Sequence, residues 1–171
     1  IYPQVDLHPE FGLHYAQSNL LLENTGNGHY TDATAKAGPG FALVQPSRGL
    51  AVGDYDNDGD LDLAISNLDA SPNLLRNDSA RGSWLAVILE ASPWSGTMVG
   101  AKVVIEAGGR RQIQDLAAGG SFMSSNDPRL HFGLGAARVA DRIEVTWPGG
   151  AKQVLTEIPA NQYVTIRKKR G

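Results

Sequence analysis

The chain has 171 residues, with 18 acidic and 15 basic side chains, a formal net charge of −3, and 42% hydrophobic residues. That length can form one good hydrophobic core or two small ones. No apolar run approaches the roughly 18 residues that a membrane-spanning helix needs, and none resembles the apolar core of a secretory signal, so we expect no membrane span. The absence of cysteine excludes disulfide frameworks, thiolate zinc sites and thiol nucleophiles.

Charge is divided unevenly along the chain. Residues 1–80 carry 11 acids and 3 bases, a net charge of −8, whereas residues 81–171 carry 7 acids and 12 bases, a net charge of +5. This asymmetry predicts two modules, residues 1–81 and residues 82–171. Four of the bases stand together at residues 167–170, and no broad basic face accompanies them. We therefore expect no binding to nucleic acid.

The first module contains a short motif that occurs twice. Asn19–Asn24 (NLLLEN) returns as Asn73–Asn77 (NLLRN), which places Asn24 and Asn77 a distance of 77 − 24 = 53 residues apart. A period of this size suits a propeller blade or a similar repeat. Two unrelated strands that end in asparagine turns would give the same pattern.

The acidic loop, Asp54–Asp62 (DYDNDGDLD), is the most informative segment. Its carboxylates alternate with other residues and repel one another, so a compact loop needs a cation. Calcium takes about six to eight oxygen ligands, which a tight loop supplies from side chains at positions 1, 3 and 5, a backbone carbonyl at position 7 and a group at position 9. Glycine at position 6, here Gly59, allows the turn. The spacing thus predicts calcium ligands at Asp54, Asp56, Asp58, Asp60 through its carbonyl, and Asp62.

Position 12 of this loop distinguishes it from a helical calcium-binding motif. An exit helix would carry glutamate there, but the residue is Ile65, within a run typical of a strand. We therefore expect the loop to connect two strands, residues 50–53 and 63–66. Magnesium is a weaker candidate because it retains its water. An acidic turn that only maintains solubility, and a catalytic carboxylate pair, stay as alternatives; a catalytic pair needs two carboxyl groups held apart across a pocket.

The second module has clear strand patterns and no helical periodicity. Residues 102–107 and 111–116 flank Gly108-Gly109 and predict a hairpin with Val103 and Ile105 on one face. Further strands are expected in the following segments: residues 85–89, 142–147, a return strand through residues 154–155, and 162–167. The sequence predicts an antiparallel β-sandwich-like module.

Several other side chains are of types that often carry function. Trp84 and Trp147 lie in predicted strands and are expected to pack, whereas Trp94 is the best candidate for an exposed sugar-stacking platform. His131 is expected to be a strand residue satisfied by its neighbours, because the histidines show no zinc-binding spacing. The polar stretch of residues 121–129 reads as a loop, more often structural than functional. No GxSxG nucleophile motif is present.

The sequence resembles a known combination of families. Residues 49–67 (GLAVGDYDNDGDLDLAISN) and the following NLLRND resemble the FG-GAP/VCBS repeat, the calcium-loop blade of integrin-like β-propellers, and residues 18–34 resemble the segment that links such repeats. Three stretches, GSWLAVIL, residues 99–135 and DRIEVTWPGG, resemble the ASPIC/UnbV domain that follows these repeats in cartilage acidic protein-like secreted proteins. The resemblance implies an all-β chain, a partial β-propeller-type blade with a calcium loop followed by an antiparallel β-sandwich-like module.

The resemblance also implies a function. It points to a non-enzymatic, extracellular or cell-surface module for adhesion or recognition, stabilised by Ca²⁺, whose partner is a protein or glycan at the cell surface. A carbohydrate-binding or carbohydrate-processing accessory module is the alternative, and a spacer in a larger surface protein is a third possibility. A closed propeller needs at least about four blades, so we expect this chain to be part of a longer one.

Overall fold

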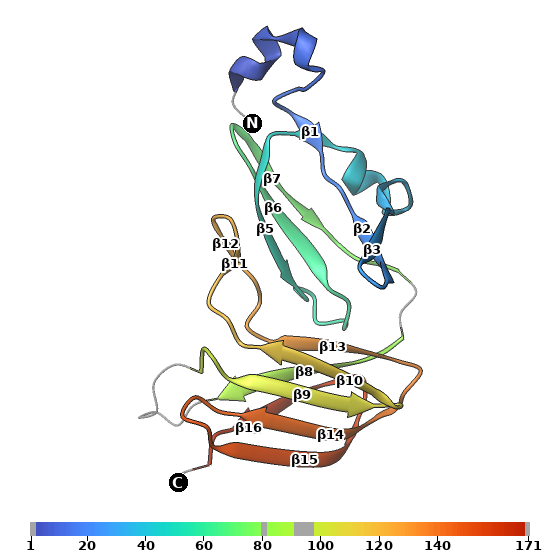
Figure 1. Cartoon of the computed structure of the whole chain (residues 1–171), viewed down its shortest axis with the longest axis vertical. Coiled ribbons are helices and arrows are strands. Elements are labelled where there is room, and N and C mark those ends of the chain that lie inside the picture. The colour runs from blue at the N-terminus through green and yellow to red at the C-terminus, as the bar shows by residue number, and fades with distance from the viewer. Residues whose placement is uncertain (1–2, 80–81, 91–97, 170–171) are drawn as a thin grey trace. The chain divides into compact units, whose positions relative to one another are not determined.

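The computed structural model describes residues 3–79, 82–90 and 98–169, and within them the chain is all-β (Figure 1). Strands and short 3₁₀ helices make up its regular structure, and these residues contain no α-helix. Nowhere in the described part is there a helix with the length and apolar character to cross a bilayer. The predicted fold class is confirmed.

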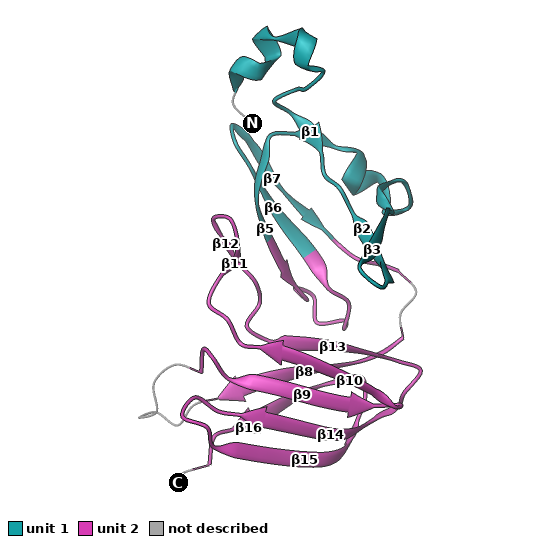
Figure 2. Cartoon of the chain, viewed as in Figure 1, with its two compact units in different colours: residues 1–50, 63–75 teal, residues 51–62, 76–171 magenta. Residues whose placement is uncertain are grey.

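Backbone contacts divide the chain into two compact units (Figure 2). Unit 1 comprises residues 1–50 and 63–75, and unit 2 comprises residues 51–62 and 76–171. The acidic loop thus belongs to the same unit as the C-terminal strands, although it lies in the first of the two modules that the charge pattern predicts. The division into modules at residues 81 and 82, as parts that fold independently, stays a prediction.

Unit 1 is built from small sheets. β1 pairs with β4 and β2 pairs with β3, each as a two-stranded sheet. β5, β6 and β7 form a three-stranded sheet. The acidic loop connects β5 to β6, as expected. The elements are η1 Pro3–Leu7, η2 Pro9–Phe11, β1 Gln17–Ser18, β2 Leu22–Gly26, β3 His29–Asp32, η3 Thr34–Lys36, η4 Pro39–Ala42, β4 Val44–Gln45, β5 Ser47–Gly53, β6 Asp62–Asn67 and β7 Ala70–Leu75.

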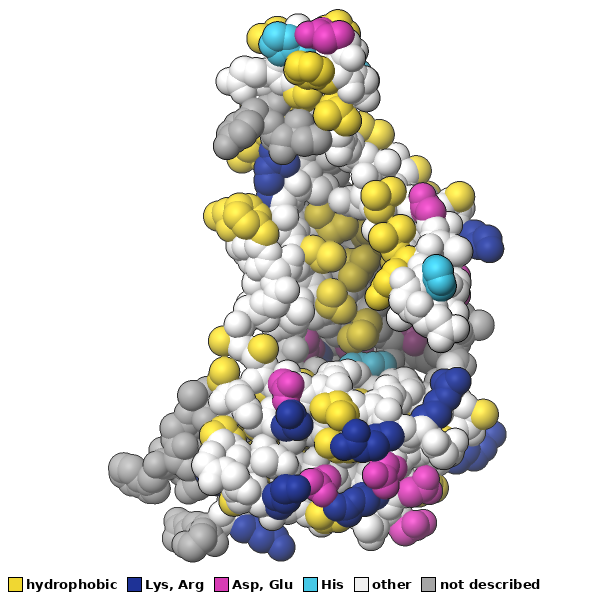
Figure 3. Space-filling view, in the orientation of Figure 1, with side chains coloured by type: hydrophobic (Ala, Val, Ile, Leu, Met, Phe, Trp, Pro, Cys, Tyr) yellow, Lys and Arg dark blue, Asp and Glu magenta, His cyan; other side chains and the backbone are white. Residues whose placement is uncertain are grey.

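Unit 1 buries little of its apolar surface. Among its described residues, the buried hydrophobic side chains are Phe41 and Ile65. Figure 3 shows hydrophobic side chains on the surface of this unit. The large apolar side chains of unit 1 that remain exposed are Leu7, Phe11, Leu13, Leu20, Leu21, Leu22, Tyr30, Leu43, Val44, Leu50, Leu68 and Leu74. Such exposure is typical of a repeat that buries its apolar faces against neighbouring repeats.

Unit 2 is a β-sandwich of two sheets. The first sheet has the strand order β10-β9-β14-β15 and the second has the order β13-β8-β16. A separate two-stranded ribbon, β11-β12, lies between β10 and β13 in the sequence. The strands are β8 Ser83–Glu90, β9 Lys102–Ala107, β10 Arg110–Asp115, β11 Gly120–Ser121, β12 Ser124–Ser125, β13 Leu130–Gly135, β14 Val139–Thr146, β15 Lys152–Pro159 and β16 Gln162–Arg167.

The sandwich core follows the alternation expected from the sequence. On β9, Val103 and Ile105 are fully buried, and the β9–β10 hairpin turns at Gly108-Gly109 with positive φ at both glycines. The two sheets share one apolar cluster whose fully buried members are Leu85, Val87, Ala101, Val103, Ile105, Phe132, Ala140, Ile143 and Val145. The face of β9 on which alternation groups Val103 and Ile105 is therefore the face that packs into the core.

The closing strand differs from the expected antiparallel arrangement. β16 pairs with β8 in parallel, with Gln162 opposite Leu85 and Arg167 opposite Glu90. The chain leaves the first sheet after β15 and crosses at Ala160-Asn161, where Asn161 has φ of 60°. A crossover between sheets permits a parallel neighbour, which a tight hairpin does not.

Truncation of Phe132 tests this core. Phe132 is fully buried in β13, so Phe132→Ala is expected to lower the free energy of unfolding by about 3–5 kcal/mol. Ile113→Ala on β10, where the side chain is 48% exposed, should lower it by less than about 1 kcal/mol. Urea unfolding followed by tryptophan fluorescence measures both, and equal losses would contradict the assignment of the core.

Candidate metal centre

The acidic loop winds around the carboxylate of its first aspartate. Asp54 is 3% exposed, and its two carboxylate oxygens accept the backbone N–H groups of Asp58 at 3.1 Å and of Gly59 at 2.8 Å. Asp58 in turn accepts the N–H of Asp60 at 2.9 Å. Asn57 and Gly59 adopt positive φ of 61° and 100°, and so permit the tight turn.

Three of the predicted ligands come together in this loop. Carboxylate oxygens of Asp54, Asp56 and Asp58 all lie within 4.8 Å of one another. Asp56 is exposed and Asp58 is half-buried, so the cluster opens toward solvent on one side. Three negative charges this close repel one another. The cluster can therefore hold a cation, and its donors are all oxygen.

Asp62 lies outside this three-carboxylate cluster. It is 2% exposed, and its oxygens accept the backbone N–H groups of Tyr55 at 3.1 Å and of Asn77 at 2.8 Å. Asp62 thus ties both ends of the loop to the chain that follows β7. The carbonyl of Asp60 and the carboxylate of Asp62 as metal ligands stay predictions, but the closing of the loop by Asp62 is a structural role that spacing alone does not reveal.

The outer face of the β13-β8-β16 sheet receives the loop. His131 and Tyr163 flank Ala86 on the two neighbouring strands, and Trp84 precedes Ala86 by two residues on the same face of β8. Trp84 stacks on His131 with ring centroids 5.7 Å apart and meets Tyr163 edge-on at 5.1 Å. These side chains form an aromatic platform, defined here as Trp84, His131 and Tyr163.

The platform contacts the loop at its glycine. His131 Nε2 lies 2.8 Å from the carbonyl oxygen of Gly59. A Cβ atom at Gly59 would lie 2.1 Å from the indole of Trp84, so only glycine fits against this ring. His131 is thus satisfied by its neighbours, as expected. Trp84 and Trp147 are buried, also as expected, whereas Trp94 lies outside the described residues.

Tyr163 reaches the loop from the last strand. Its hydroxyl donates a hydrogen bond to Oδ2 of Asp54. Burial raises the pKa of Tyr163, and the hydrogen bond and negative charge of Asp54 raise it further. The phenol therefore stays protonated and serves as a donor to Asp54.

Arg129 holds the loop from another direction. Its guanidinium donates to the backbone oxygen of Asp54 and to Oδ1 of Asn57, and it lies 5.0 Å above the ring of Tyr163. Its Nε also donates to Asp127 at 2.7 Å. Burial acts to raise the pKa of Asp127, but the hydrogen bonds and charge of Arg129 outweigh it, so the net pKa is below the usual range. This ion pair directs the guanidinium toward the loop.

The polar stretch of residues 121–129 therefore has a structural role. Asn126 Oδ1 accepts the N–H of Val52 at 3.0 Å, and Asp127 donates its own N–H to the oxygen of Val52 at 2.9 Å. Together with Arg129, these residues hold the strand that enters the acidic loop. The sequence places them about 70 positions from the loop, so only the fold brings them together.

Comparisons with known proteins agree with this architecture. Residues 6–65 match the family model of the FG-GAP-like repeat, and residues 95–171 match that of the ASPIC and UnbV family. These two matches, in this order along the chain, confirm the resemblance seen in the sequence. It is similar to cartilage acidic protein 1 of Xenopus tropicalis, with 35% identity over 121 residues, or 66% of this chain. The match spans only 18% of that protein.

Substitution of Gly59 tests the fit of the loop on Trp84. In Gly59→Ala the new Cβ atom would clash with the Trp84 indole, and the residue would also be held at a positive φ. In Gly149→Ala the residue would be held at a positive φ of 93°, but its Cβ atom would point into open space. Gly149→Ala is expected to lower the free energy of unfolding by about 1–3 kcal/mol, and Gly59→Ala by more, because the indole must also move. Urea unfolding measures the difference, and a smaller loss for Gly59→Ala would contradict the packing described.

Removal of the Arg129 guanidinium tests the polar attachment. Arg129→Met leaves acceptors on Asp54 and Asn57 without their donor, so we expect a loss of about 1.5–3 kcal/mol in the free energy of unfolding. Arg167 forms an exposed ion pair with Glu90, with its side chain 80% exposed, and Arg167→Met should cost less than about 1 kcal/mol. Equal losses in denaturation experiments would show that Arg129 is only a surface charge.

Proposed function

We propose that this chain is a non-enzymatic calcium-binding module for extracellular recognition or adhesion. The observation that carries the proposal is the cluster of Asp54, Asp56 and Asp58, whose carboxylates lie within 4.8 Å on one loop. The match to FG-GAP-like repeats and the similarity to a cartilage acidic protein support the extracellular, adhesion-type role. A protein or glycan at the cell surface is the proposed partner.

The donors of the cluster suit calcium. Carboxylate and carbonyl oxygens are the ligands that this hard cation prefers, at coordination numbers of about six to eight. Magnesium demands near-octahedral geometry and retains several waters, so an acidic loop built for close ligation favours calcium. Side chains of Asp54, Asp56 and Asp58 would hold the ion, with the carbonyl of Asp60 and the carboxylate of Asp62 as further predicted ligands.

Calcium would act by fixing the loop against the sandwich. A cation that binds only the folded loop stabilises that state, by about 2.7 kcal/mol at a concentration one hundred times the dissociation constant. Asp54 already accepts hydrogen bonds from the loop and from Tyr163, so an ion bound beside it would stabilise the same contacts that attach the loop to β16. Roughly millimolar extracellular calcium would saturate even a weak site.

Thermal unfolding of the chain tests the site. We expect the melting temperature to rise by several degrees in excess calcium relative to chelator, because the ion relieves the repulsion among three carboxylates, and to rise less in magnesium. Differential scanning fluorimetry under the three conditions measures this. An unchanged melting temperature in calcium would refute the metal site.

A single aspartate substitution separates the metal from the fold. Asp58→Ala is expected to lower the melting temperature in calcium but to change it little in chelator. Asp141→Ala removes an exposed carboxylate at β14, outside the loop, and should preserve the calcium-induced rise. If Asp58→Ala destabilises the chain equally in both conditions, the residue supports the loop without binding calcium.

A further inference from the structure

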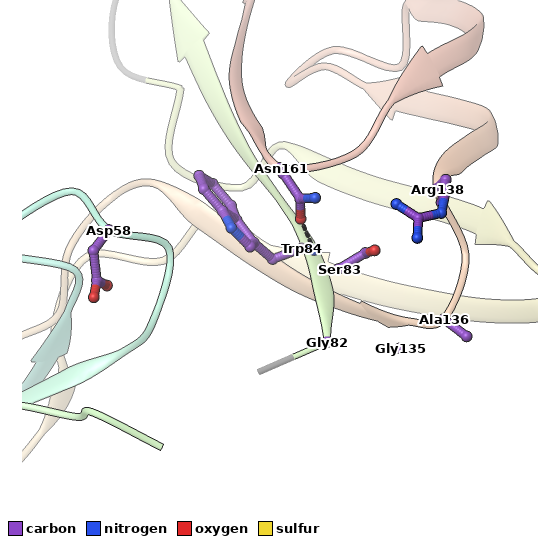
Figure 4. A pocket seen from close by; sticks show the side chains of 8 residues that line it. All are labelled: Asp58, Gly82, Ser83, Trp84, Gly135, Ala136, Arg138 and Asn161. Carbon is purple, nitrogen blue, oxygen red and sulfur yellow. Dashed lines mark hydrogen bonds between the residues drawn. The ribbon is translucent and has the colours of Figure 1, made fainter. Parts of the chain in front are cut away.

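A cavity of about 590 Å³ lies in unit 2 and is bordered on one side by Trp84 and by Asp58 of the acidic loop (Figure 4). It lies where β8 begins, where β13 ends and where the chain crosses toward β16. Gly82 and Gly135 approach each other closely there, since a Cβ atom at Gly82 would meet the backbone oxygen of Gly135 at 2.7 Å. The lining residues are Asp58, Gly82, Ser83, Trp84, Gly135, Ala136, Arg138 and Asn161.

One end of the cavity gathers hydrogen-bond donors. Figure 4 shows the side chains of Ser83, Arg138 and Asn161 facing one another. Within the described part of the chain, the Arg138 guanidinium, the Ser83 hydroxyl and the Asn161 amide nitrogen have no hydrogen-bond or ion-pair partner. These are three donor groups of different kinds around one space, and they match the oxygens of a carboxylate.

The backbone fixes one of these donors in place. Asn161 Oδ1 accepts the N–H of Trp84 at 3.1 Å, while the N–H of Asn161 donates to the oxygen of Trp84 at 2.6 Å. This reciprocal pair holds the Asn161 amide with its oxygen occupied and its NH₂ group free to donate. The donor end is therefore partly organised before any ligand arrives, which lowers the entropy cost of binding.

The other end of the cavity carries negative charge. Asp58 lines it and belongs to the three-carboxylate cluster. This end disfavours a second acidic group on the ligand, whereas a ligand hydroxyl can donate to a carboxylate. The ligand must therefore combine one carboxylate with hydroxyl groups.

We propose that this cavity binds the carboxylate-bearing sugar unit of an acidic glycan. Arg138 binds the carboxylate, Ser83 and Asn161 donate to its oxygens or to a ring hydroxyl, and sugar hydroxyls face Asp58. A run of acidic peptide side chains would bring carboxylates toward Asp58 and fits less well. The proposal deepens the recognition role proposed above by naming the ligand class, and its donor end needs no metal.

Calorimetric titration of the whole chain tests this site. Trigalacturonate is the probe, and its carboxyl-reduced counterpart, a neutral galactose trisaccharide, is the matched ligand control. We expect the acidic trisaccharide to bind at least about tenfold more tightly, since one charge-assisted guanidinium contact accounts for about that factor. Equal binding of the two trisaccharides would overturn the proposal.

Variants locate the binding. Arg138→Gln should weaken trigalacturonate binding about tenfold, and Ser83→Ala should weaken it less. Arg110→Gln, an exposed arginine at the start of β10 that does not line the cavity, should have no effect. Equal losses in Arg138→Gln and Arg110→Gln would reduce the binding to nonspecific attraction and overturn the site. Hexaglutamate binding as tightly as trigalacturonate would replace the glycan by an acidic peptide and overturn the ligand class.

The titrations are run in calcium and in chelator. Binding that depends on Arg138 in both conditions supports the glycan site whether or not the melting temperature responds to calcium. A calcium-induced rise in melting temperature without any Arg138-dependent binding supports the metal site and refutes the glycan site. The two proposals can therefore fail separately.

Discussion

Unit 2 depends on the packing of an acidic loop against the outer face of a β-sheet. Gly59 lies flat on the Trp84 indole, and His131, Tyr163 and Arg129 bind the surrounding backbone and the Asp54 carboxylate. A surface loop with this much negative charge would otherwise repel itself into solvent. Here cationic and neutral donors from the sandwich offset part of that charge at Asp54, whose carboxylate clusters with those of Asp56 and Asp58. The loop thus supplies the carboxylates of the candidate metal centre, and the sandwich supplies the side chains that hold the loop.

One face of the β13-β8-β16 sheet packs into the sandwich core, and the other contacts the acidic loop. Leu85 and Val87 point into the sandwich core, whereas Trp84 and Ala86 are buried on the opposite face. Four consecutive buried residues on β8 are typical of a strand covered on both sides. Ala86 is paired with His131 on one neighbouring strand and with Tyr163 on the other. Because its side chain is small, the rings of His131 and Tyr163 can approach the loop. One short strand thereby joins the hydrophobic core to the candidate metal centre.

The sequence predicts local features well and distant contacts poorly. Alternation identifies Val103 and Ile105 as core residues, and the spacing of the aspartates locates the acidic loop, because both signals lie within a few residues. Arg129 and Tyr163 are 75 and 109 residues from Asp54 in the chain. Nothing in their local sequence marks them, since an arginine in a polar stretch and a tyrosine in a strand are ordinary. The parallel pairing of β16 is missed for the same reason: adjacency in a sheet after a crossover has no local pattern.

The place of β16 as the last strand of unit 2 has a consequence for synthesis. The strand that supplies Tyr163 is the last of unit 2 to leave the ribosome, whereas the loop it contacts is among the first parts of that unit to emerge. Contacts between such distant segments form slowly, because loop closure must come before their stabilisation. The loop therefore gains its hydrogen bond from Tyr163 only after β16 has joined β8. Premature termination before Gln162 would leave every aspartate of the loop in the protein and yet remove the phenol that holds the first of them.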